Sequence, residues 1–493
     1  MNKASPALYF IFVARQRTDK VTFLCSECGD TFSRWEGRCP ACGAWNTLAE
    51  FAVPAIAKTK EPRRSVRTES APQELASISV DSSPRRLSGI GEFNRVLGDG
   101  LVPGSVILLA GDPGIGKSTL LLQVAAAFAQ QAPPVVYVSG EESALQVRLR
   151  AERLGTPGNG IYFLPETNIV TVLEHLEKAS PTVVIIDSIQ TMASPDLPGG
   201  AGSVAQVREC ARLFIEWAKS SQVPVLLTGH VTKEGNVAGP RVLEHMVDVV
   251  LYMEGDPLTS FRLLRGVKNR FGSTNEVGVF EMRETGLVEV LEPSRLLLSG
   301  RRENSVGSAV VSVLEGARPL LVEIQGLTNP TVFPAPRRTG NGVEFQRLLM
   351  VVAVLSRRLG LSLATQDVLV NVVGGLKVNE PAADLGMALA ITSSLRDESV
   401  HPTLVALGEI GLGGELRPVP QIRRRLVEAA RLGFDRAIVP SNSGSEDVEV
   451  PGIEVSAVSD VRQALRLGLS QAKRPSGRSG SEEMEAAHLG GGS

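Results

Sequence analysis

Residues 111–118 read Gly-Asp-Pro-Gly-Ile-Gly-Lys-Ser, a complete phosphate-binding loop of the form G-x-x-x-x-G-K-[ST]. The apolar run at 105–110 predicts a buried strand that leads into this loop, and residues 119–128 predict a helix that leads out of it. Glycines let backbone N–H groups close around phosphates at the helix N-terminus, where the helix dipole adds partial positive charge. The stretch therefore predicts an α/β domain that binds a nucleoside triphosphate.

The polar residues of this loop have separate expected tasks. Lys117 is expected to reach the β and γ phosphates and to act in catalysis, and the Ser118 hydroxyl is expected to bind Mg²⁺. The predicted nucleotide site consists of Gly111, Asp112, Pro113, Gly114, Ile115, Gly116, Lys117, Ser118 and Thr119.

Apolar runs alternate with helical stretches throughout the region from about residue 85 to residue 293. Strands are predicted at 135–139, 182–187, 223–229 and 249–253. Such alternation predicts a mostly parallel sheet covered by helices, with ligands bound at the carboxyl ends of the strands.

Carboxylates follow two of these predicted strands. The strand at 182–187 ends in Asp187, which predicts a Walker B acid that acts in catalysis and holds the Mg²⁺ shell through water. The strand at 135–139 is followed by Glu141 and Glu142, and either carboxylate is placed to orient a water that attacks the γ phosphate. Glu141 is the first choice and Glu142 the second. The alternative for both is a solvated helix N-terminus, where acidic residues are favoured by the dipole.

Four of the five cysteines form two pairs with the spacing of a metal site near the start of the chain. They are Cys25, Cys28, Cys39 and Cys42. Two such turns present four thiolates, which predicts a tetrahedral Zn²⁺ site that holds together a small module at 21–50. Redox-active or disulfide-linked cysteines are the alternative. The fifth cysteine, Cys210, is expected to be a core residue on a helix at 204–220.

The remaining stretches divide the 493-residue chain into further parts. Residues 1–20 are predicted to be a disordered extension, 51–84 a flexible linker, and 471–493 a disordered tail rich in Gly, Ser and Glu. Residues 300–468 predict a second α/β domain, with an amphipathic helix near 344–359.

The composition bears on two kinds of partner, nucleic acid and membrane. With 51 basic and 53 acidic side chains the net charge is −2, so nucleic acid must be attracted by local patches and not by the whole surface. No segment reaches the roughly 18 apolar residues that a membrane-spanning helix needs, so no membrane contact is expected.

The polar loop at 229–241 follows a predicted strand and contains glycine and basic residues. His230 is a candidate sensor of the γ phosphate, and Lys233 and Arg241 are candidates for contact with DNA phosphates. An inert surface loop is the alternative.

Residues 268–272 read Lys-Asn-Arg-Phe-Gly and place two cations on one side of an extended segment, since Lys268 and Arg270 are two residues apart. On a protruding edge such a pair suits insertion into the phosphate site of a neighbouring subunit, as an arginine finger does. The alternatives are contact with nucleic-acid phosphates and a solvated edge strand whose charges prevent aggregation. The candidate segment comprises Lys268, Asn269, Arg270, Phe271 and Gly272.

Together these elements resemble the bacterial RadA/Sms DNA-repair ATPases over about residues 21–468. The paired cysteines, the phosphate loop, the Ser-Gly-Glu-Glu-Ser stretch at 139–143, the strand ending in Asp187 and the pentapeptide at 268–272 occur in that order in the family, and the pentapeptide is its most diagnostic mark. The resemblance implies an α/β protein with an N-terminal zinc knuckle, a RecA-like P-loop ATPase core and a C-terminal Lon-protease-like domain. It also favours Glu141 over Glu142.

The same resemblance implies a function and its partners. The expected protein hydrolyses ATP with Mg²⁺, forms hexameric rings and moves along DNA to extend recombination intermediates by branch migration. Single-stranded and branched DNA and a RecA-type recombinase are the expected partners, in a cytoplasmic, nucleoid-associated location.

The Lon-like resemblance raises a rival function, ATP-dependent proteolysis. Aligned with the protease dyad, Ala382 takes the place of the serine and Arg425 that of the lysine. An alanine has no nucleophile and an arginine cannot be deprotonated to act as a base, so the domain is expected to be a scaffold. A nucleotide-controlled assembly ring is a further alternative.

Several arginines of this domain are candidates to line a DNA channel. A solvated helix face is the alternative for the last three of them. They are Arg337, Arg338, Arg423, Arg424 and Arg425.

Overall fold

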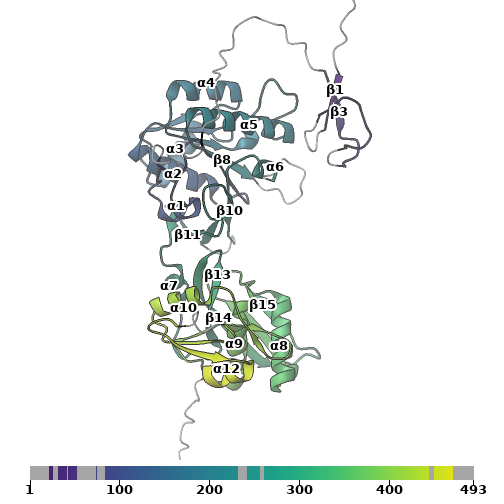
Figure 1. Ribbon diagram of the computed structural model, residues 1–493, viewed down its shortest axis with the longest axis vertical. Helices are drawn as coiled ribbons and strands as arrows, with labels where there is room; N and C mark the ends of the chain where they lie inside the picture. The colour runs from purple at the N-terminus through teal and green to yellow at the C-terminus, as the bar shows by residue number, and fades with distance from the viewer. Residues whose placement is uncertain are drawn as a thin grey trace, which may run out of the picture. The chain divides into compact units, whose positions relative to one another are not determined.

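The computed structural model of the chain describes residues 21–25, 31–40, 43–52, 74, 84–230, 241–255, 260–443 and 449–469 (Figure 1). The chain divides into two compact units, Met1–Leu291 and Glu292–Ser493. No helix in these described ranges is long and apolar enough to cross a bilayer.

The N-terminal module is a small antiparallel sheet. Strands β1 (Val21–Cys25), β2 (Thr31–Phe32) and β3 (Leu48–Ala52) pair in the order β2-β1-β3. Its buried cluster consists of Cys25, Cys39 and Leu48, with Phe23 and Phe32 packed against it. A core this small cannot hold a domain by itself, as the sequence led us to expect.

The first unit is built on a nine-stranded sheet in the order β12-β11-β10-β9-β4-β8-β7-β5-β6. Six neighbouring strands are parallel, which confirms the mostly parallel sheet, and β10 to β12 extend it as an antiparallel meander. The strands are β4 (Val106–Gly111), β5 (Val135–Ser139), β6 (Ile161–Leu164), β7 (Val183–Asp187), β8 (Val225–His230), β9 (Val249–Glu254), β10 (Phe261–Asn269), β11 (Val277–Arg283) and β12 (Gly286–Glu289).

Helices cover both faces of this sheet, as Figure 1 shows. Every residue of β4, β5 and β7 is buried, which is why these strands read as continuous apolar runs. One core cluster contains residues of α1 and α2, and a second contains residues of α4 and α5. The helices are α1 (Gly91–Leu97), α2 (Lys117–Gln131), α3 (Ala144–Arg153), α4 (Ile169–Ala179), α5 (Val204–Ser221) and the single turn α6 (Arg241–Glu244), with a 3-10 turn η2 (Ile189–Thr191).

The second unit contains a seven-stranded mixed sheet in the order β15-β16-β14-β13-β17-β20-β21 and a two-stranded sheet of β18 (Glu409–Ile410) and β19 (Leu416–Arg417). The strands of the larger sheet are β13 (Ser308–Glu315), β14 (Arg318–Pro330), β15 (Arg338–Asn341), β16 (Gln366–Val372), β17 (Leu404–Ala406), β20 (Arg436–Pro440) and β21 (Glu454–Val458). The helical segments are α7 (Pro293–Leu298), α8 (Phe345–Leu359), η3 (Leu363–Thr365), η4 (Pro381–Ala383), α9 (Asp384–Arg396), α10 (Ile422–Arg431) and α12 (Val461–Gly468).

Helices also lie on both faces of the seven-stranded sheet. Val310 packs in one cluster with Leu426 of α10, whereas the neighbouring Val311 faces Gly386 of α9. Because successive strand residues point to opposite faces, α9 and α10 cover opposite sides. A Cβ atom on Gly386 would lie 2.0 Å from Cγ1 of Val311, so the close approach of α9 to the sheet requires glycine.

Candidate functional site

The phosphate loop connects β4 to α2 and depends on glycine at two positions. Gly116 has φ of 116°, and a Cβ atom there would lie 2.6 Å from Cε of Met282. A Cβ atom on Gly111 would lie 2.5 Å from the carbonyl oxygen of Met253. The loop is therefore packed against β9 and β11 in a conformation that side chains would disrupt, and its open side is left for a ligand.

Lys117 is the first residue of α2 and is only 3% exposed. Its ammonium group donates hydrogen bonds of 2.9 Å to the carbonyl oxygens of Gly111 and Asp112. Burial lowers the pKa of Lys117, while the nearby Asp187, Asp112 and Glu141 carboxylates raise it. A buried cation beside backbone N–H groups at a helix N-terminus fits a polyphosphate, so the residues present fit the expected nucleotide.

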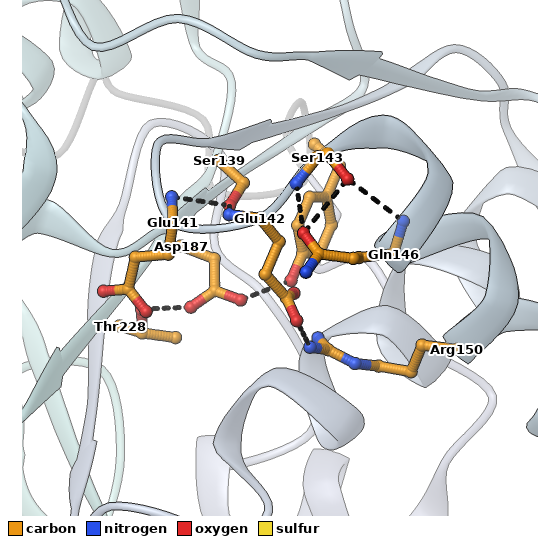
Figure 2. Close-up of polar contacts among 9 residues, drawn as sticks. Ser139, Glu141, Glu142, Ser143, Gln146, Arg150, Asp187 and Thr228 are labelled. Atoms are coloured by element: carbon orange, nitrogen blue, oxygen red, sulfur yellow. Dashed lines mark hydrogen bonds and ion pairs between the residues drawn. The ribbon is translucent and has the colours of Figure 1, made fainter.

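Asp187 ends β7 and is held from both neighbouring strands (Figure 2). The Thr228 hydroxyl of β8 donates to Oδ1 at 2.8 Å, and the Tyr137 hydroxyl of β5 donates to Oδ2 at 2.6 Å. Burial and the neighbouring carboxylate raise the pKa of Tyr137 well above its ordinary value, so this hydroxyl stays protonated and remains a donor. An acidic oxygen ligand at this edge fits Mg²⁺.

The two glutamates after β5 differ in their surroundings (Figure 2). The Ser188 hydroxyl, next to Asp187 in the chain, donates to Oε1 of Glu141 at 2.5 Å. Glu142 instead forms an ion pair with Arg150 of α3. Their backbone N–H groups both lie 3.3 Å from the Ser139 hydroxyl. Glu141 is thus tied to the Walker B strand, whereas Glu142 is tied to a helix.

Strand register brings these groups to one edge of the sheet. Ser139 pairs with Asp187, and Gly111 pairs with His230. The carboxyl ends of β4, β5, β7 and β8 therefore lie at the same edge of the sheet. This places the Asp187 and Glu141 carboxylates close enough to Lys117 to raise its pKa. The described residues of this edge form the candidate active site.

The Lys-Asn-Arg segment lies at the opposite edge. Asn269 pairs with Val249, at the start of β9, whereas Leu263 pairs with Glu254 at its end. The stretch from Leu263 to Asn269 spans about 20 Å at the usual strand rise. Lys268 and Arg270 are therefore remote from the phosphate loop of their own chain.

The alternative of a solvated edge strand was wrong for this segment, because β10 lies between β9 and β11 and the segment lies at the end of this inner strand. The Lys268 ammonium donates to the carbonyl oxygens of Glu244, His245 and Val247 at 2.7, 3.3 and 2.9 Å. Arg270 forms a 2.9 Å ion pair with Asp248, and its side chain is 49% exposed. Both cations reach the same segment, which confirms that they project to one side.

The neighbouring residues of the pentapeptide stabilise the bend after β10. The Asn269 amide donates to the carbonyl oxygen of Leu97 at 3.2 Å and accepts from the Phe271 backbone at 2.9 Å. Gly272 approaches Gly98, since a Cβ atom there would lie 3.4 Å from its Cα. The segment thus joins the sheet to the end of α1.

The polar loop after β8 is only partly described. Lys233 lies outside the described residues, and Arg241 is the first residue of α6. His230 is the last residue of β8 and pairs with Gly111 of the loop strand.

Cys25 and Cys39, one from each cysteine pair, are buried in the same cluster. Cys28 and Cys42 lie outside the described residues, and no group of three metal-binding side chains occurs within the described part. Two buried thiols from separate turns fit half of a tetrahedral zinc site. Cys210 is a core residue, as expected, and burial raises the pKa of its thiol to about 12.

The two residues aligned with the protease dyad are both buried. Arg425 is 0% exposed and forms an ion pair with Glu380, with further hydrogen bonds to the carbonyl oxygens of Pro420 and Ser312 at 3.0 and 2.5 Å. Ala382 is 1% exposed. The expectation that Arg425 lines a DNA channel was wrong, because its guanidinium ties α10 to β13 and η4 in the domain interior.

The other candidate arginines of the second unit are at the surface. Arg337 lies over the Phe333 ring at 3.9 Å, and Arg338 donates to the carbonyl oxygens of Leu363 and Gln366. Arg423 and Arg424 are exposed on α10.

Sequence reasoning missed several residues of the site. Tyr137 and Thr228 resemble ordinary core residues of apolar strands, and only the strand pairing brings them to Asp187. Arg262 of β10 is 8% exposed and donates to the carbonyl oxygen of Ile115 in the phosphate loop at 3.2 Å. Arginine in an apolar stretch was the one available signal for it.

Three family models match the chain. Residues 81–236 match the AAA domain, 23–50 match the rubredoxin metal binding domain, and 343–443 match subunit ChlI of Mg-chelatase. The parallel sheet, the phosphate loop and the carboxylates at its edge define a P-loop ATPase of AAA or RecA-like type, which is joined to a zinc-ribbon module and a Lon-like domain.

Relatives that align over nearly their whole length show which family within this class of ATPases the chain belongs to. DNA repair protein RadA of Bacillus subtilis is 48% identical over 91% of this chain and 99% of its own length. The proteins of the same name from Synechocystis and Streptococcus pyogenes are 47% and 49% identical, over 93% and 92% of this chain and 95% and 99% of theirs. The chain belongs to the RadA family of DNA repair proteins.

Solved structures also resemble part of the chain. A KaiC-like protein of Pyrococcus horikoshii is 22% identical, with a TM-score of 0.36, over 42% of this chain and 99% of its own. At this level of similarity it supports no conclusion about function.

The buried ion pair predicts that Arg425→Ala loosens the second unit. Removing the guanidinium leaves two carbonyl groups without their donor and takes the buried cation away from the Glu380 carboxylate, which keeps the Leu314 backbone N–H as a donor. We expect this to cost about 3 kcal/mol. Hydrogen exchange of peptides from β13 and α10 is the suitable measurement, because the tryptophans and tyrosines of the chain all precede residue 292. Arg424→Ala, on the exposed side of the same helix, is the matched control and should leave exchange unchanged. Equal protection in both variants would contradict the structural role of Arg425.

Proposed function

We propose that this chain is a DNA-dependent ATPase that acts as a motor in recombinational DNA repair and promotes branch migration. The observation that carries the proposal is the convergence of Lys117, Asp187 and Glu141 at one sheet edge, in a chain that is 48% identical to a DNA repair protein over 91% of its length.

The residues of the site divide the work of hydrolysis. Backbone N–H groups from Gly111 to Thr119 and the Lys117 ammonium bind the phosphates. Ser118 and Asp187 hold Mg²⁺, which neutralises the charge that develops on the phosphates when it is bound. Glu141 orients the attacking water and accepts its proton.

The contacts of the two glutamates support this assignment. Ser188 holds Glu141 beside the Walker B strand, and Glu141 is near enough to Lys117 to raise its pKa. Glu142 is already engaged with Arg150, so moving toward a nucleotide would cost it that ion pair.

We further propose that Arg270 acts on a neighbouring chain. The Lys-Asn-Arg segment and the phosphate loop lie at opposite edges of one sheet, so a contact with ATP requires a second copy. Lys268 is engaged by three carbonyl groups, whereas Arg270 is half exposed and held by one ion pair. This difference supports Arg270 as the finger and Lys268 as its support. Contact with DNA phosphates is the competing role.

The proposed partners follow from the family. They are single-stranded and branched DNA, a RecA-type recombinase and further copies of this chain in a hexameric ring, at the nucleoid in the cytoplasm. Candidate DNA contacts outside the pentapeptide are Lys233, Arg241, Arg337 and Arg338. The cysteine module is proposed to bind one Zn²⁺ per chain, held by Cys25, Cys28, Cys39 and Cys42.

A Lon-type protease is the rival function, and the contacts of the second unit count against it. Ala382 supplies no nucleophile, and Arg425, which cannot act as a base, is buried in an ion pair with Glu380. The domain therefore serves as a scaffold in this proposal.

The proposal predicts that single-stranded DNA stimulates ATP hydrolysis and that the protein extends a branched recombination intermediate only when ATP is hydrolysed. Lys117→Ala should abolish both activities, because the phosphates lose their buried cation. Labelled casein should remain intact. ATP hydrolysis that is unchanged when DNA is added would favour a nucleotide-controlled assembly ring. Cleavage of casein would favour a Lon-type protease.

Glu141→Gln is expected to bind ATP with unchanged affinity and to lose hydrolysis by at least about a hundredfold, as is typical for loss of a general base. Glu142→Gln is the matched control, since it removes the neighbouring carboxylate and should lower turnover by less than about threefold. Single-turnover hydrolysis with radiolabelled ATP measures both variants. The opposite order of effects would transfer the role to Glu142.

Arg270→Ala is expected to keep ATP binding and lose DNA-stimulated hydrolysis. Mixing it with Lys117→Ala chains should restore part of the activity, because one mixed interface then combines an intact loop with an intact finger. Hydrolysis measured across mixing ratios tests this. No recovery at any ratio, combined with weaker DNA binding by Arg270→Ala alone, would assign the residue to DNA.

A further inference from the structure

The Asp187 carboxylate is held by two hydroxyl groups that come from different strands. Thr228 donates to one carboxylate oxygen and Tyr137 to the other, at 2.8 and 2.6 Å (Figure 2). Asp187 is 3% exposed, and Tyr137 and Thr228 are fully buried. The carboxylate therefore sits between β5 and β8 with one neutral donor on each side.

These two hydrogen bonds fix the plane of the carboxylate. Rotation about its Cβ–Cγ bond would break both bonds at once, and losing hydrogen bonds is costly in a buried site. Each oxygen keeps a second lone pair, since an ionised carboxylate offers about four acceptor positions. The two hydroxyl groups of Tyr137 and Thr228 thus form a clamp that orients the Asp187 carboxylate. They do not neutralise its charge, and they leave it able to accept further hydrogen bonds or a metal ligand.

We propose that Tyr137 and Thr228 are positioning residues that hold Asp187 ready for the hydrated Mg²⁺ ion of the bound nucleotide. This inference rests on the proposed ATPase function. A carboxylate that is fixed before the ion arrives loses less conformational freedom on binding, so the clamp strengthens binding of the metal–nucleotide complex and leaves binding of the metal-free nucleotide unchanged.

This arrangement differs from the usual hydrogen bonding of buried hydroxyl groups. A buried tyrosine needs one acceptor, and a backbone carbonyl would serve. Tyr137 instead uses the carboxylate at the sheet edge, and its ring is held in place by stacking on Phe163 with centroids 6.4 Å apart. Thr228 has a second acceptor in the Ile186 carbonyl, but at 3.4 Å this contact is longer than its 2.8 Å bond to Asp187.

The test compares the affinity of a fluorescent ADP analogue in Mg²⁺ and in EDTA, using the full-length chain. Tyr137→Phe and Thr228→Val each remove one hydroxyl and keep the shape of the side chain. We expect each variant to lower the gain in affinity that Mg²⁺ provides by about tenfold, as for loss of one hydrogen bond to a charged group, and to leave affinity in EDTA unchanged. Half-saturation of ATP hydrolysis by Mg²⁺ should rise in parallel.

Two controls separate positioning from stability. Tyr162→Phe removes the hydroxyl of an exposed tyrosine on the adjacent strand β6 and should behave as the unsubstituted chain. Thr228→Ser restores the donor and should recover the Mg²⁺ dependence that Thr228→Val loses. If Tyr137→Phe fails to fold, comparing Thr228→Val with Thr228→Ser still shows whether a hydroxyl group that holds Asp187 controls the Mg²⁺ dependence of binding.

Three results would overturn the inference. They are an unchanged Mg²⁺ gain in Tyr137→Phe and Thr228→Val, an equal loss of affinity in EDTA, or an equal loss in Thr228→Ser. An unsubstituted chain that binds the nucleotide with Mg²⁺ but does not hydrolyse ATP would instead refute the proposed function. The affinities of the variants in Mg²⁺ and in EDTA would still test the role of Tyr137 and Thr228.

Discussion

Burial of a single ammonium group, that of Lys117, sets the requirements for the rest of the first unit. A cation that is 3% exposed needs acceptors and opposite charge nearby. Two carbonyl groups accept hydrogen bonds from it, and three nearby carboxylates supply the negative charge. Those carboxylates come from the loop and from the ends of β5 and β7, so the charge is balanced only when the parallel strands are in register. The order of the sheet and the electrostatics of the site therefore depend on each other.

The sheet also separates two chemical roles by distance. Groups at the carboxyl ends of the parallel strands form the proposed nucleotide site, whereas the Lys-Asn-Arg segment lies at the end of the antiparallel strand β10, at the opposite ends of these strands. Near its start the same strand carries Arg262, whose guanidinium contacts the phosphate loop. A single strand thus contacts the loop near one end and is followed directly by the candidate finger at the other.

The local pattern of apolar residues was enough to predict the parallel strands of the first sheet. These strands are buried on both faces, so each appears in the sequence as an unbroken apolar run. The strand at 135–139 has the predicted bounds, and β7 begins one residue later than expected. The antiparallel position of β10 and the contacts of Tyr137 and Thr228 could not be predicted this way. Tyr137 is 50 residues from Asp187 and Thr228 is 41, so their roles arise from strand pairing and leave no local signature. The burial of Arg425 was missed for a similar reason, since its partner Glu380 is 45 residues away.

The buried Arg425–Glu380 pair has a consequence for how this domain can change over time. Serine at position 382 alone would add a hydroxyl with no base nearby, and lysine at position 425 alone would exchange a forked donor with several partners for a single point charge. Each step toward a peptidase is therefore either useless or destabilising on its own. The contacts that keep the domain folded therefore also oppose the substitutions that a peptidase dyad would need.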